Sequence, residues 1–279
     1  MKLGILLAGK RPDDMAKRLE QAREGGFSLC QLNFLQTGLS RADLMSIVDR
    51  VLEFGVRPIA IGCYVNPLRP DDATLMGACR TDLDLLLHSL DIIGARKVVI
   101  WSGTHAATAF EEHDENRSEA SIHALRDFVT DVVRSTQARR YAIVIEPWRS
   151  HVLNHEDRVA DFHHSLPPHV AERIRYVLDV PNLLTKERYA NKDSAVRSIC
   201  GTIGPLAGLV HLKDVIMPPD GDEGLAAPGQ GKLDYPAYME SIFRWAAPEA
   251  AAIVKNVPAS EYSDARTYLL QLSDRLELT

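Results

Sequence analysis

YAIVIE, residues 141–146, is a short apolar run that ends in an acidic residue, and the same pattern returns in RYVLD (175–179) and LVHLKD (209–214). Nearly continuous runs of Val, Ile and Leu are typical of parallel strands that are covered on both faces. Longer stretches with helical spacing separate the runs. Strands that alternate with helices in this way indicate a parallel sheet with crossover helices.

Working outward from these runs, we place apolar runs at 3–8, 28–34, 56–63, 97–102, 141–146, 175–179, 209–214 and 251–256. Helices are expected at 13–26, 41–55, 81–95, 119–137 and 194–204, and several of these end at a Gly. About eight such units suit a (β/α)8 barrel, or TIM barrel, so we predict a single barrel domain over residues 1–279. A longer loop is expected at 215–233.

An open Rossmann-like sheet is the alternative architecture for alternating strands and helices. The segment after the first predicted strand, LLAGKRPDD (6–14), lacks the GxGxxG series that a dinucleotide-binding turn needs. The closed barrel is therefore the preferred interpretation.

Composition excludes several classes of partner. The chain has a formal net charge of −6, which argues against a nucleic-acid-binding protein. Its apolar runs are too short to cross a bilayer, and the first residues, MKLGILLAG (1–9), are interpreted as a strand and not as a signal peptide. We therefore expect a cytoplasmic protein. The four cysteines lack CxxC spacing, which favours reduced thiols over a zinc site.

Three polar residues stand at the carboxyl ends of consecutive predicted strands: Glu146, Asp179 and His211. Active sites of TIM barrels lie at this end of the strands. Two carboxylates and an imidazole are a plausible site for a divalent cation such as Mg²⁺, Mn²⁺ or Co²⁺. The alternative is that these side chains are paired with Lys213 or Arg149 and have a structural role.

The order of these residues resembles a known family. Asn182 follows Asp179 by three positions, HLKD (211–214) closes the seventh predicted strand, and PGQGKLDY (228–235) follows it; GCYVNPLRPDD (62–72) follows the third. Together these segments resemble the sugar phosphate isomerase/epimerase family of xylose isomerase-like TIM barrels, over nearly the whole chain.

The resemblance implies a divalent metal held by Glu, Asp, His and a second Glu at the end of the eighth strand. The first three correspond to Glu146, Asp179 and His211. The fourth position falls in AAIVKNVPASEY (251–262), where this chain has Lys255. In that family the two glutamates also move a proton between adjacent carbons of a sugar, so the change to Lys removes a ligand and an acid-base group together.

Three interpretations of Lys255 stay open. Its ammonium group could take the place of the cation in a metal-free pocket, because neighbouring carboxylates favour the charged form. A neutral lysine could act as a base or as a Schiff-base nucleophile. The side chain could also turn outward and leave a metal on three protein ligands and water.

Other side chains are candidates for binding a substrate. Trp101 closes the fourth predicted strand, where it could stack on a ligand or plug the barrel. We also expect ligand contacts from His151, Asn182, Lys213 and Gln230, although His151 could be an ordinary surface histidine. The remaining histidines that fall in predicted helices are interpreted as surface or packing residues: His88, His123, His163 and His164.

The sequence and the resemblance together predict an isomerase or epimerase of a small sugar-like polyhydroxy carbonyl compound, with Glu146 and Lys255 as catalytic residues. A barrel that binds such a ligand without turnover, or a lyase or hydrolase on the same pocket, is the alternative. The apolar segment LDLLLHSLDII (83–93) could bury surface against a second copy. We expect Glu146, Asp179, His211 and Lys255 to face one mouth of the barrel.

Overall fold

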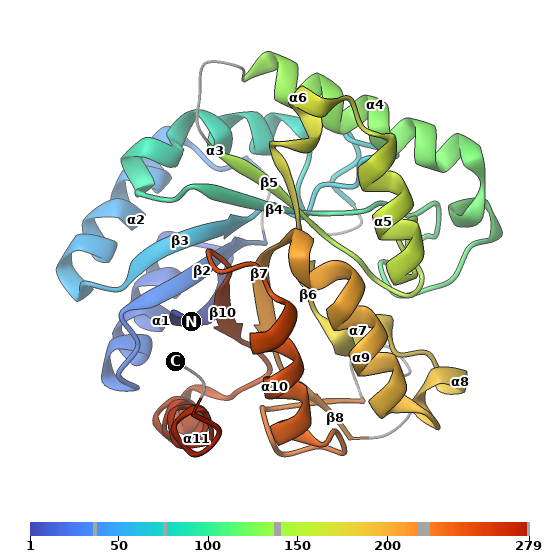
Figure 1. The fold of residues 1–279 in the computed structure, drawn as a ribbon. Helices are drawn as coiled ribbons and strands as arrows, with labels where there is room; N and C mark the ends of the chain where they lie inside the picture. The colour runs from blue at the N-terminus through green and yellow to red at the C-terminus, as the bar shows by residue number, and fades with distance from the viewer. Residues whose placement is uncertain (36–37, 75–76, 137–140, 217–223, 278–279) are drawn as a thin grey trace.

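A computed structural model describes residues 1–35, 38–74, 77–136, 141–216 and 224–277. Its parallel strands close into a barrel, in the order β1, β10, β7, β6, β5, β4, β3, β2 (Figure 1). The strands are β1 (Leu3–Gly9), β2 (Leu29–Phe34), β3 (Arg57–Gly62), β4 (Lys97–Trp101), β5 (Ala142–Glu146), β6 (Ile174–Leu178), β7 (Ala207–Leu212) and β10 (Ala251–Val254). The predicted (β/α)8 fold class is confirmed.

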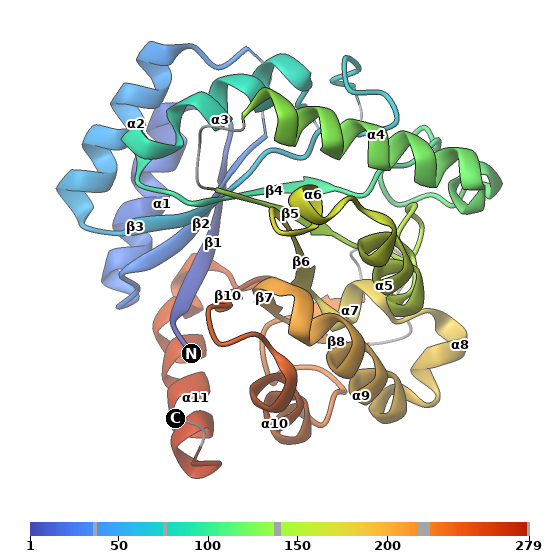
Figure 2. The ribbon, with the colours of Figure 1, turned by 45° about the horizontal axis from the view of Figure 1, so that its top comes forward.

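Helices cover the outside of the barrel (Figure 1). The longer ones are α1 (Pro12–Glu24), α2 (Arg41–Phe54), α3 (Arg80–Ile93), α4 (Glu119–Ser135), α5 (Glu156–Ser165), α9 (Lys192–Ile203), α10 (Tyr235–Trp245) and α11 (Tyr262–Arg275). The short ones are α6 (Pro168–Ala171), α7 (Val180–Leu183) and α8 (Lys186–Tyr189), with single turns at η1 (Asp114–Arg117), η2 (Gly204–Leu206) and η3 (Ala259–Glu261). The end of α1 lies against the start of α11, where Gly25 is next to Tyr262, and Figure 2 shows α11 close to the N-terminus of the chain.

Local sequence explains where the helices begin and end. Ser40 accepts a hydrogen bond from the Asp43 backbone N–H and Asp43 accepts one from Ser40, a reciprocal cap that starts α2. Gly55 and Gly94 end α2 and α3 with φ of 65° and 82°, a conformation that glycine adopts without strain. None of the described helices is long and apolar enough to cross a membrane.

The core lies between the barrel and its helices, as the apolar strands predict. Every residue of β2 and β7 is buried, and the inward faces of the helices supply leucine, isoleucine and valine to the same core. Burial of this kind stabilises by about 25 cal/mol per Å² of apolar surface. The polar residues that are buried at the carboxyl ends of the strands therefore stand on a rigid base.

The predicted loop at 215–233 contains a short antiparallel hairpin, β8 (Asp214–Val215) and β9 (Leu225–Ala226), while residues 217–223 lie outside the described part. The Asp214 carboxylate accepts hydrogen bonds from the backbone N–H groups of Val215, Gly231 and Leu233. A Cβ atom at position 231 would lie 2.3 Å from the Val215 carbonyl oxygen. The glycine-rich segment is thus fixed by Asp214, which explains the glycine at position 231.

Candidate active site

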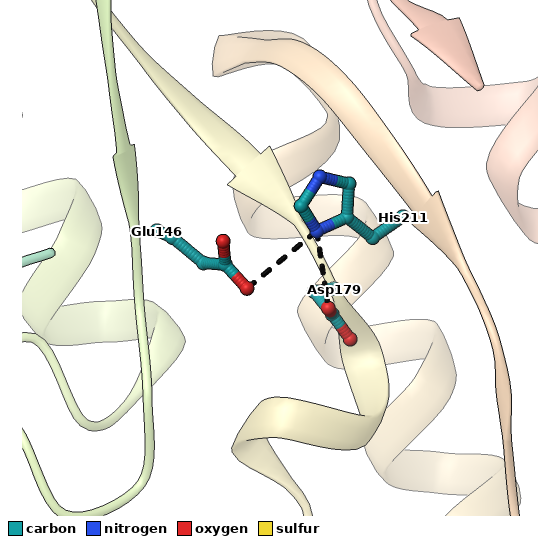
Figure 3. Close-up of side chains that lie close together, drawn as sticks. All are labelled: Glu146, Asp179 and His211. Atoms are coloured by element: carbon teal, nitrogen blue, oxygen red, sulfur yellow. Dashed lines mark ion pairs between the residues drawn. The ribbon is translucent and has the colours of Figure 1, made fainter. Parts of the chain in front are cut away.

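Glu146, Asp179 and His211 meet at the carboxyl ends of β5, β6 and β7, where their side chains point toward one another (Figure 3). His211 Nδ1 lies 3.3 Å from Asp179 Oδ2 and 3.5 Å from Glu146 Oε1. All three side chains are buried. The cluster could hold a metal ion, since one ligand atom from each residue lies within 4.8 Å of the others.

Two lysines complete the charges of this cluster. Lys255, directly after β10, places its Nζ 3.1 Å from Glu146 Oε1 and 3.5 Å from Asp179 Oδ2. Lys213, directly after β7, places its Nζ 3.2 Å from Asp179 Oδ2 and also donates to Asn182 Oδ1. The two carboxylates are therefore matched by two ammonium groups. Lys255 faces the mouth, because it lines the pocket there and contacts both carboxylates, and only 15% of its side chain is exposed.

The lysines decide the ionisation of the carboxylates. Burial alone would raise the pKa of Glu146, but the charge of Lys255 and the smaller effects of His211 and Lys213 together outweigh burial, and the pKa lies well below the usual value. Burial also opposes ionisation of Asp179, and Lys213 and Lys255 lower its pKa. Burial disfavours the charge on Lys255 itself, yet Glu146 and Asp179 raise its pKa. Both carboxylates and Lys255 are consequently charged at neutral pH.

Lys213 differs from Lys255 in the balance of these effects. Burial lowers its pKa to about 8, although Asp179 partly opposes the change. Its Nζ also lies 5.3 Å from the centre of the Trp148 ring, an arrangement that suits a cation. The two ammonium groups are thus held differently, and Lys255 is the more strongly ionised.

A neutral network reaches the same carboxylate from the other side of the barrel. Tyr64, after β3, donates a hydrogen bond of 2.9 Å to Glu146 Oε2. Burial, and to a smaller extent the charge of Glu146, raises the pKa of Tyr64 well above the usual value. The amide groups of Gln31 and Asn33, on β2, each donate to the Tyr64 hydroxyl oxygen at 3.3 Å. None of these three residues was predicted as a site residue from the sequence. Their signal was the alternation in QLNF (31–34), which turns both amides to one face of a buried strand.

This network also fixes the orientation of the His211 ring. A carboxylate only accepts, so Tyr64 donates to Glu146 and its oxygen accepts from the amide nitrogen of Gln31. The Gln31 amide oxygen then faces His211 Nε2 at 3.0 Å, and that nitrogen must be the donor. The other ring nitrogen, Nδ1, therefore faces the two carboxylates. Metal-binding histidines are commonly oriented in this way, by a hydrogen bond from the ring nitrogen that does not face the site.

A pocket of about 270 Å³ opens above the cluster. Glu146, Lys213 and Lys255 line it, whereas Asp179 and His211 are not among its lining residues. The other lining residues are aromatic, apolar or amide-bearing: Leu6, Ala8, Asn33, Leu35, Tyr64, Trp101, Phe110, Trp148, Leu225 and Asn256. From the described part of the chain, a ligand in this pocket would meet the Glu146 carboxylate, the ammonium groups of Lys213 and Lys255, and an aromatic wall.

The predicted substrate-binding residues fall into different places. Trp101 lines the pocket and packs on Tyr64, with ring centres 4.9 Å apart. Asn182 is buried, and its amide donates a hydrogen bond of 2.9 Å to Glu146 Oε1. Gln230 is exposed, and its amide lies 3.5 Å from Glu261 on the surface. Neither Asn182 nor Gln230 is a lining residue of this pocket.

His151 is fully buried behind Trp101, with ring centres 4.6 Å apart, so it is not a surface histidine. It is not a lining residue of the pocket either. Its Nε2 lies 2.7 Å from the Ala109 carbonyl oxygen, next to the pocket residue Phe110. Burial lowers the pKa of His151 to about 4, so the ring is neutral at pH 7. In this arrangement His151 supports the aromatic wall.

We tested whether a divalent ion fits the cluster. The donor set is suitable, and the buried Nδ1 of His211 and Oδ1 of Asp179 have no hydrogen-bond partner within the described ranges. However, Lys255 Nζ contacts the same two carboxylate oxygens that face Nδ1. A unit charge about 4 Å from a divalent ion repels it by roughly 8 kcal/mol at an effective dielectric constant of about 20. With Lys255 in this position, the residues do not fit a divalent ion.

No protein-family model and no curated protein matches the sequence. Solved structures do match it. A D-psicose 3-epimerase determined in the presence of D-fructose is 14% identical, with a TM-score of 0.68 over 99% of both chains. The 3-keto-D-glucoside 4-epimerase YcjR from E. coli is 18% identical, with a TM-score of 0.66 over 97% of this chain and 99% of that chain.

A xylose isomerase-like TIM barrel protein from Mycobacterium smegmatis, solved in complex with magnesium, is 12% identical, with a TM-score of 0.71 over 99% of this chain and 97% of that chain. At such identities the likeness concerns the fold. The chain has the fold of the xylose isomerase-like TIM barrels, as the sequence resemblance implied.

Proposed function

We propose that this protein is an isomerase or epimerase of a small sugar-like polyhydroxy carbonyl compound. The observation that carries the proposal is the contact of 3.1 Å between the Glu146 carboxylate and the Lys255 ammonium group, both of which line the pocket. Proton transfer next to a carbonyl group needs a base for the carbon-bound proton and a positive group for the oxygen. Glu146 and Lys255 provide this pair.

In the proposed reaction, Glu146 removes the proton from the carbon next to the carbonyl group, and the electron pair of that C–H bond forms an enediolate. Lys255 donates hydrogen bonds to the oxygen on which the negative charge develops. When Lys255 turns to this oxygen, Glu146 loses one of its stabilising partners and becomes a stronger base. The hydroxyl proton moves to the former carbonyl oxygen, and Glu146 returns its proton to the former carbonyl carbon.

Among the residues that the structure describes, Glu146 is the one carboxylate that lines the pocket, and this favours transfer between adjacent carbons. Glu146 can return a proton to the face from which it was taken, which completes an isomerisation without a second acid. Epimerisation at one carbon needs a proton donor on the opposite face, and Lys255 or Lys213 would have to supply it. Isomerisation is therefore the simpler reaction for this pocket.

The walls of the pocket support a sugar-like ligand. Trp101, Phe110 and Trp148 form adjoining aromatic faces, with ring centres 5.9 Å apart for the two indoles and 5.2 Å apart for Phe110 and Trp148. Aromatic faces pack well on the C–H face of a sugar ring or chain, while Asn33 and Asn256 offer hydrogen bonds to hydroxyl groups. The two epimerases of known structure that share this fold act on sugars according to their names, which supports the same class here.

Binding without turnover is the second candidate. It is favoured by Lys255 itself, which stands where the resemblance implies a second catalytic glutamate. The pocket would then recognise a sugar-like ligand through the same aromatic and charged groups, and Glu146 would accept a hydrogen bond from it.

Solvent deuterium exchange distinguishes the two candidates. We expect the wild-type protein, incubated in D2O with a panel of aldoses, ketoses and keto-sugars, to place deuterium on carbon and to form an isomer of one of them, as measured by NMR. Glu146→Gln should lower this rate by about 100-fold or more, because it removes the base. Glu20→Gln, on the exposed face of α1, is the matched control and should leave the rate unchanged. Ligand binding without any exchange would contradict the proposed reaction and support the binding function.

A further inference from the structure

We infer that Lys255, together with Lys213, supplies the positive charge of this site, so that the site holds no divalent metal ion. The inference is independent of the proposed reaction, because metal binding can be measured without a substrate. The inference rests on three atoms that a metal ion would need as ligands: Glu146 Oε1, Asp179 Oδ2 and His211 Nδ1. His211 Nδ1 lies 3.5 Å from Glu146 Oε1 and 3.3 Å from Asp179 Oδ2.

Lys255 Nζ occupies the approach to these atoms. It contacts Glu146 Oε1 at 3.1 Å and Asp179 Oδ2 at 3.5 Å, which are the oxygens that a metal held by this cluster would need. The lysine also stands directly after β10, at the position where the resemblance implies a fourth ligand. One substitution therefore removes a ligand and places a cation against the remaining ones.

The backbone holds Lys255 in this direction. Its backbone N–H donates a hydrogen bond of 2.9 Å to the Leu212 carbonyl oxygen. This bond continues the pairing of β10 with β7 as far as the mouth of the barrel. The next residue, Asn256, has φ of 57°, a left-handed conformation that asparagine tolerates better than most residues. The chain thus turns away directly after Lys255, and the side chain is directed to the carboxylates instead of to solvent.

The charges of the cluster are already balanced without a metal. Glu146 and Asp179 contribute two negative charges, and Lys255 and Lys213 contribute two positive ones at contact distances of 3.1 to 3.5 Å. Adding a divalent ion would leave an excess of two positive charges in a buried site, which is strongly unfavourable. The ion could bind only if a lysine moved away or lost its proton.

Metal content and Mn²⁺ titration test the inference. Wild-type protein that has been incubated with Mn²⁺ or Mg²⁺ and desalted should retain far less than one equivalent of metal by mass spectrometry. Lys255→Glu restores a carboxylate and removes the cation, so its affinity for Mn²⁺, measured by calorimetry, should rise by at least about 100-fold. Lys255→Met is the matched control: it removes the charge without adding a ligand and should give a smaller rise.

The outcomes decide between the alternatives. One equivalent of tightly held metal in the wild-type protein would overturn the inference. A folded Lys255→Glu variant without any gain in Mn²⁺ affinity would also overturn it. If Lys255→Glu folds only in the presence of Mn²⁺, as followed by circular dichroism, that rescue supports the inference, because three buried carboxylates would then need the ion. Failure of Mn²⁺ to rescue an unfolded Lys255→Glu, combined with no gain in Lys255→Met, would count against it.

Discussion

The mouth of this barrel has two unlike halves. The half formed by β5, β6, β7 and β10 carries the buried charges, which are Glu146, Asp179, Lys213 and Lys255, with His211 among them. The half formed by β2, β3 and β4 carries uncharged groups, which are Gln31, Asn33, Tyr64 and Trp101. Tyr64 joins the halves through its hydrogen bond to Glu146.

The difference separates reactivity from orientation. Groups that can move a proton or bear a charge belong to the first half, while the second half fixes their directions through hydroxyl, amide and aromatic contacts. Buried charges are stable only when they are paired, so the first half should be sensitive to the loss of any member. The second half should tolerate single losses better, because a neutral hydrogen bond contributes about 1 kcal/mol.

The largest effect is expected from Lys255→Met. Removing this ammonium leaves Glu146 without its charged partner and Asp179 with Lys213 alone. Breaking a buried ion pair from one side costs about 3–5 kcal/mol, which we expect as the loss in free energy of unfolding measured with urea. The double variant Glu146→Gln/Lys255→Met should recover part of this loss, since the unpaired charge is then absent. A loss below about 1 kcal/mol would mean that the ion pairs of Lys255 with Glu146 and Asp179 contribute little to the stability of the folded protein.

The charged half could be predicted from sequence because of where its charges stand. An acidic residue or histidine that closes an apolar strand is conspicuous, and three such strands in succession indicated one site. The strand pattern likewise predicted the barrel itself. The pairing could not be predicted in the same way. From the sequence, Lys213 could either pair with these acidic residues or contact a ligand, and the structure places its Nζ 3.2 Å from Asp179 Oδ2.

The second effect concerns acid, and it tests whether His151, which follows β5 but packs against Trp101 of the uncharged half, must stay neutral. Burial keeps His151 neutral behind Trp101, with a pKa lowered from 6.5 to about 4. The unfolded chain takes up this proton near pH 6.5, whereas the folded protein does so only near pH 4. The contribution of His151 to stability is therefore complete above pH 6.5, falls as the pH decreases from 6.5 to 4, and amounts to about 3 kcal/mol in total.

Urea unfolding of the wild-type protein and of His151→Gln at several pH values measures this effect. The difference between the two proteins isolates His151 from the carboxylates and from the other histidines, because these groups are the same in both. We expect the wild-type protein to lose about 3 kcal/mol relative to the variant between pH 7 and pH 4. Parallel curves for the two proteins would show that His151 accepts a proton freely in the folded state.

The uncharged half was harder to predict because its residues are common in any strand or loop. Gln31 and Asn33 carry no charge to mark them, and their role depends on Tyr64, which follows another strand, β3. The burial of His151 depends on Ala109, 42 positions away, so its local sequence resembles a surface loop. Gln230 was selected from a glycine-rich motif, but that segment is fixed by Asp214 and leaves Gln230 exposed.

The smallest effect is expected from Tyr64→Phe, which cuts the link between the halves. The substitution removes the donor to Glu146 Oε2 and the acceptor for two amides, and it should lower the free energy of unfolding by about 1–2 kcal/mol. Tyr235→Phe is the matched control, because the buried Tyr235 hydroxyl has no hydrogen-bond partner in the part of the chain that the structure describes, and its loss should cost less.

A double-mutant cycle of Tyr64→Phe with Glu146→Gln tests whether this link is direct. The two side chains are in contact at 2.9 Å, so their effects on unfolding should differ from additivity by about 0.5 kcal/mol or more. The same cycle with Tyr235→Phe should be additive. Since Tyr64 stabilises the ionised carboxylate, its loss also weakens the preference of Glu146 for the charged form. If the Tyr64 and Glu146 effects were additive, the two halves of the mouth would be energetically separate, and the uncharged half would act on the ligand alone.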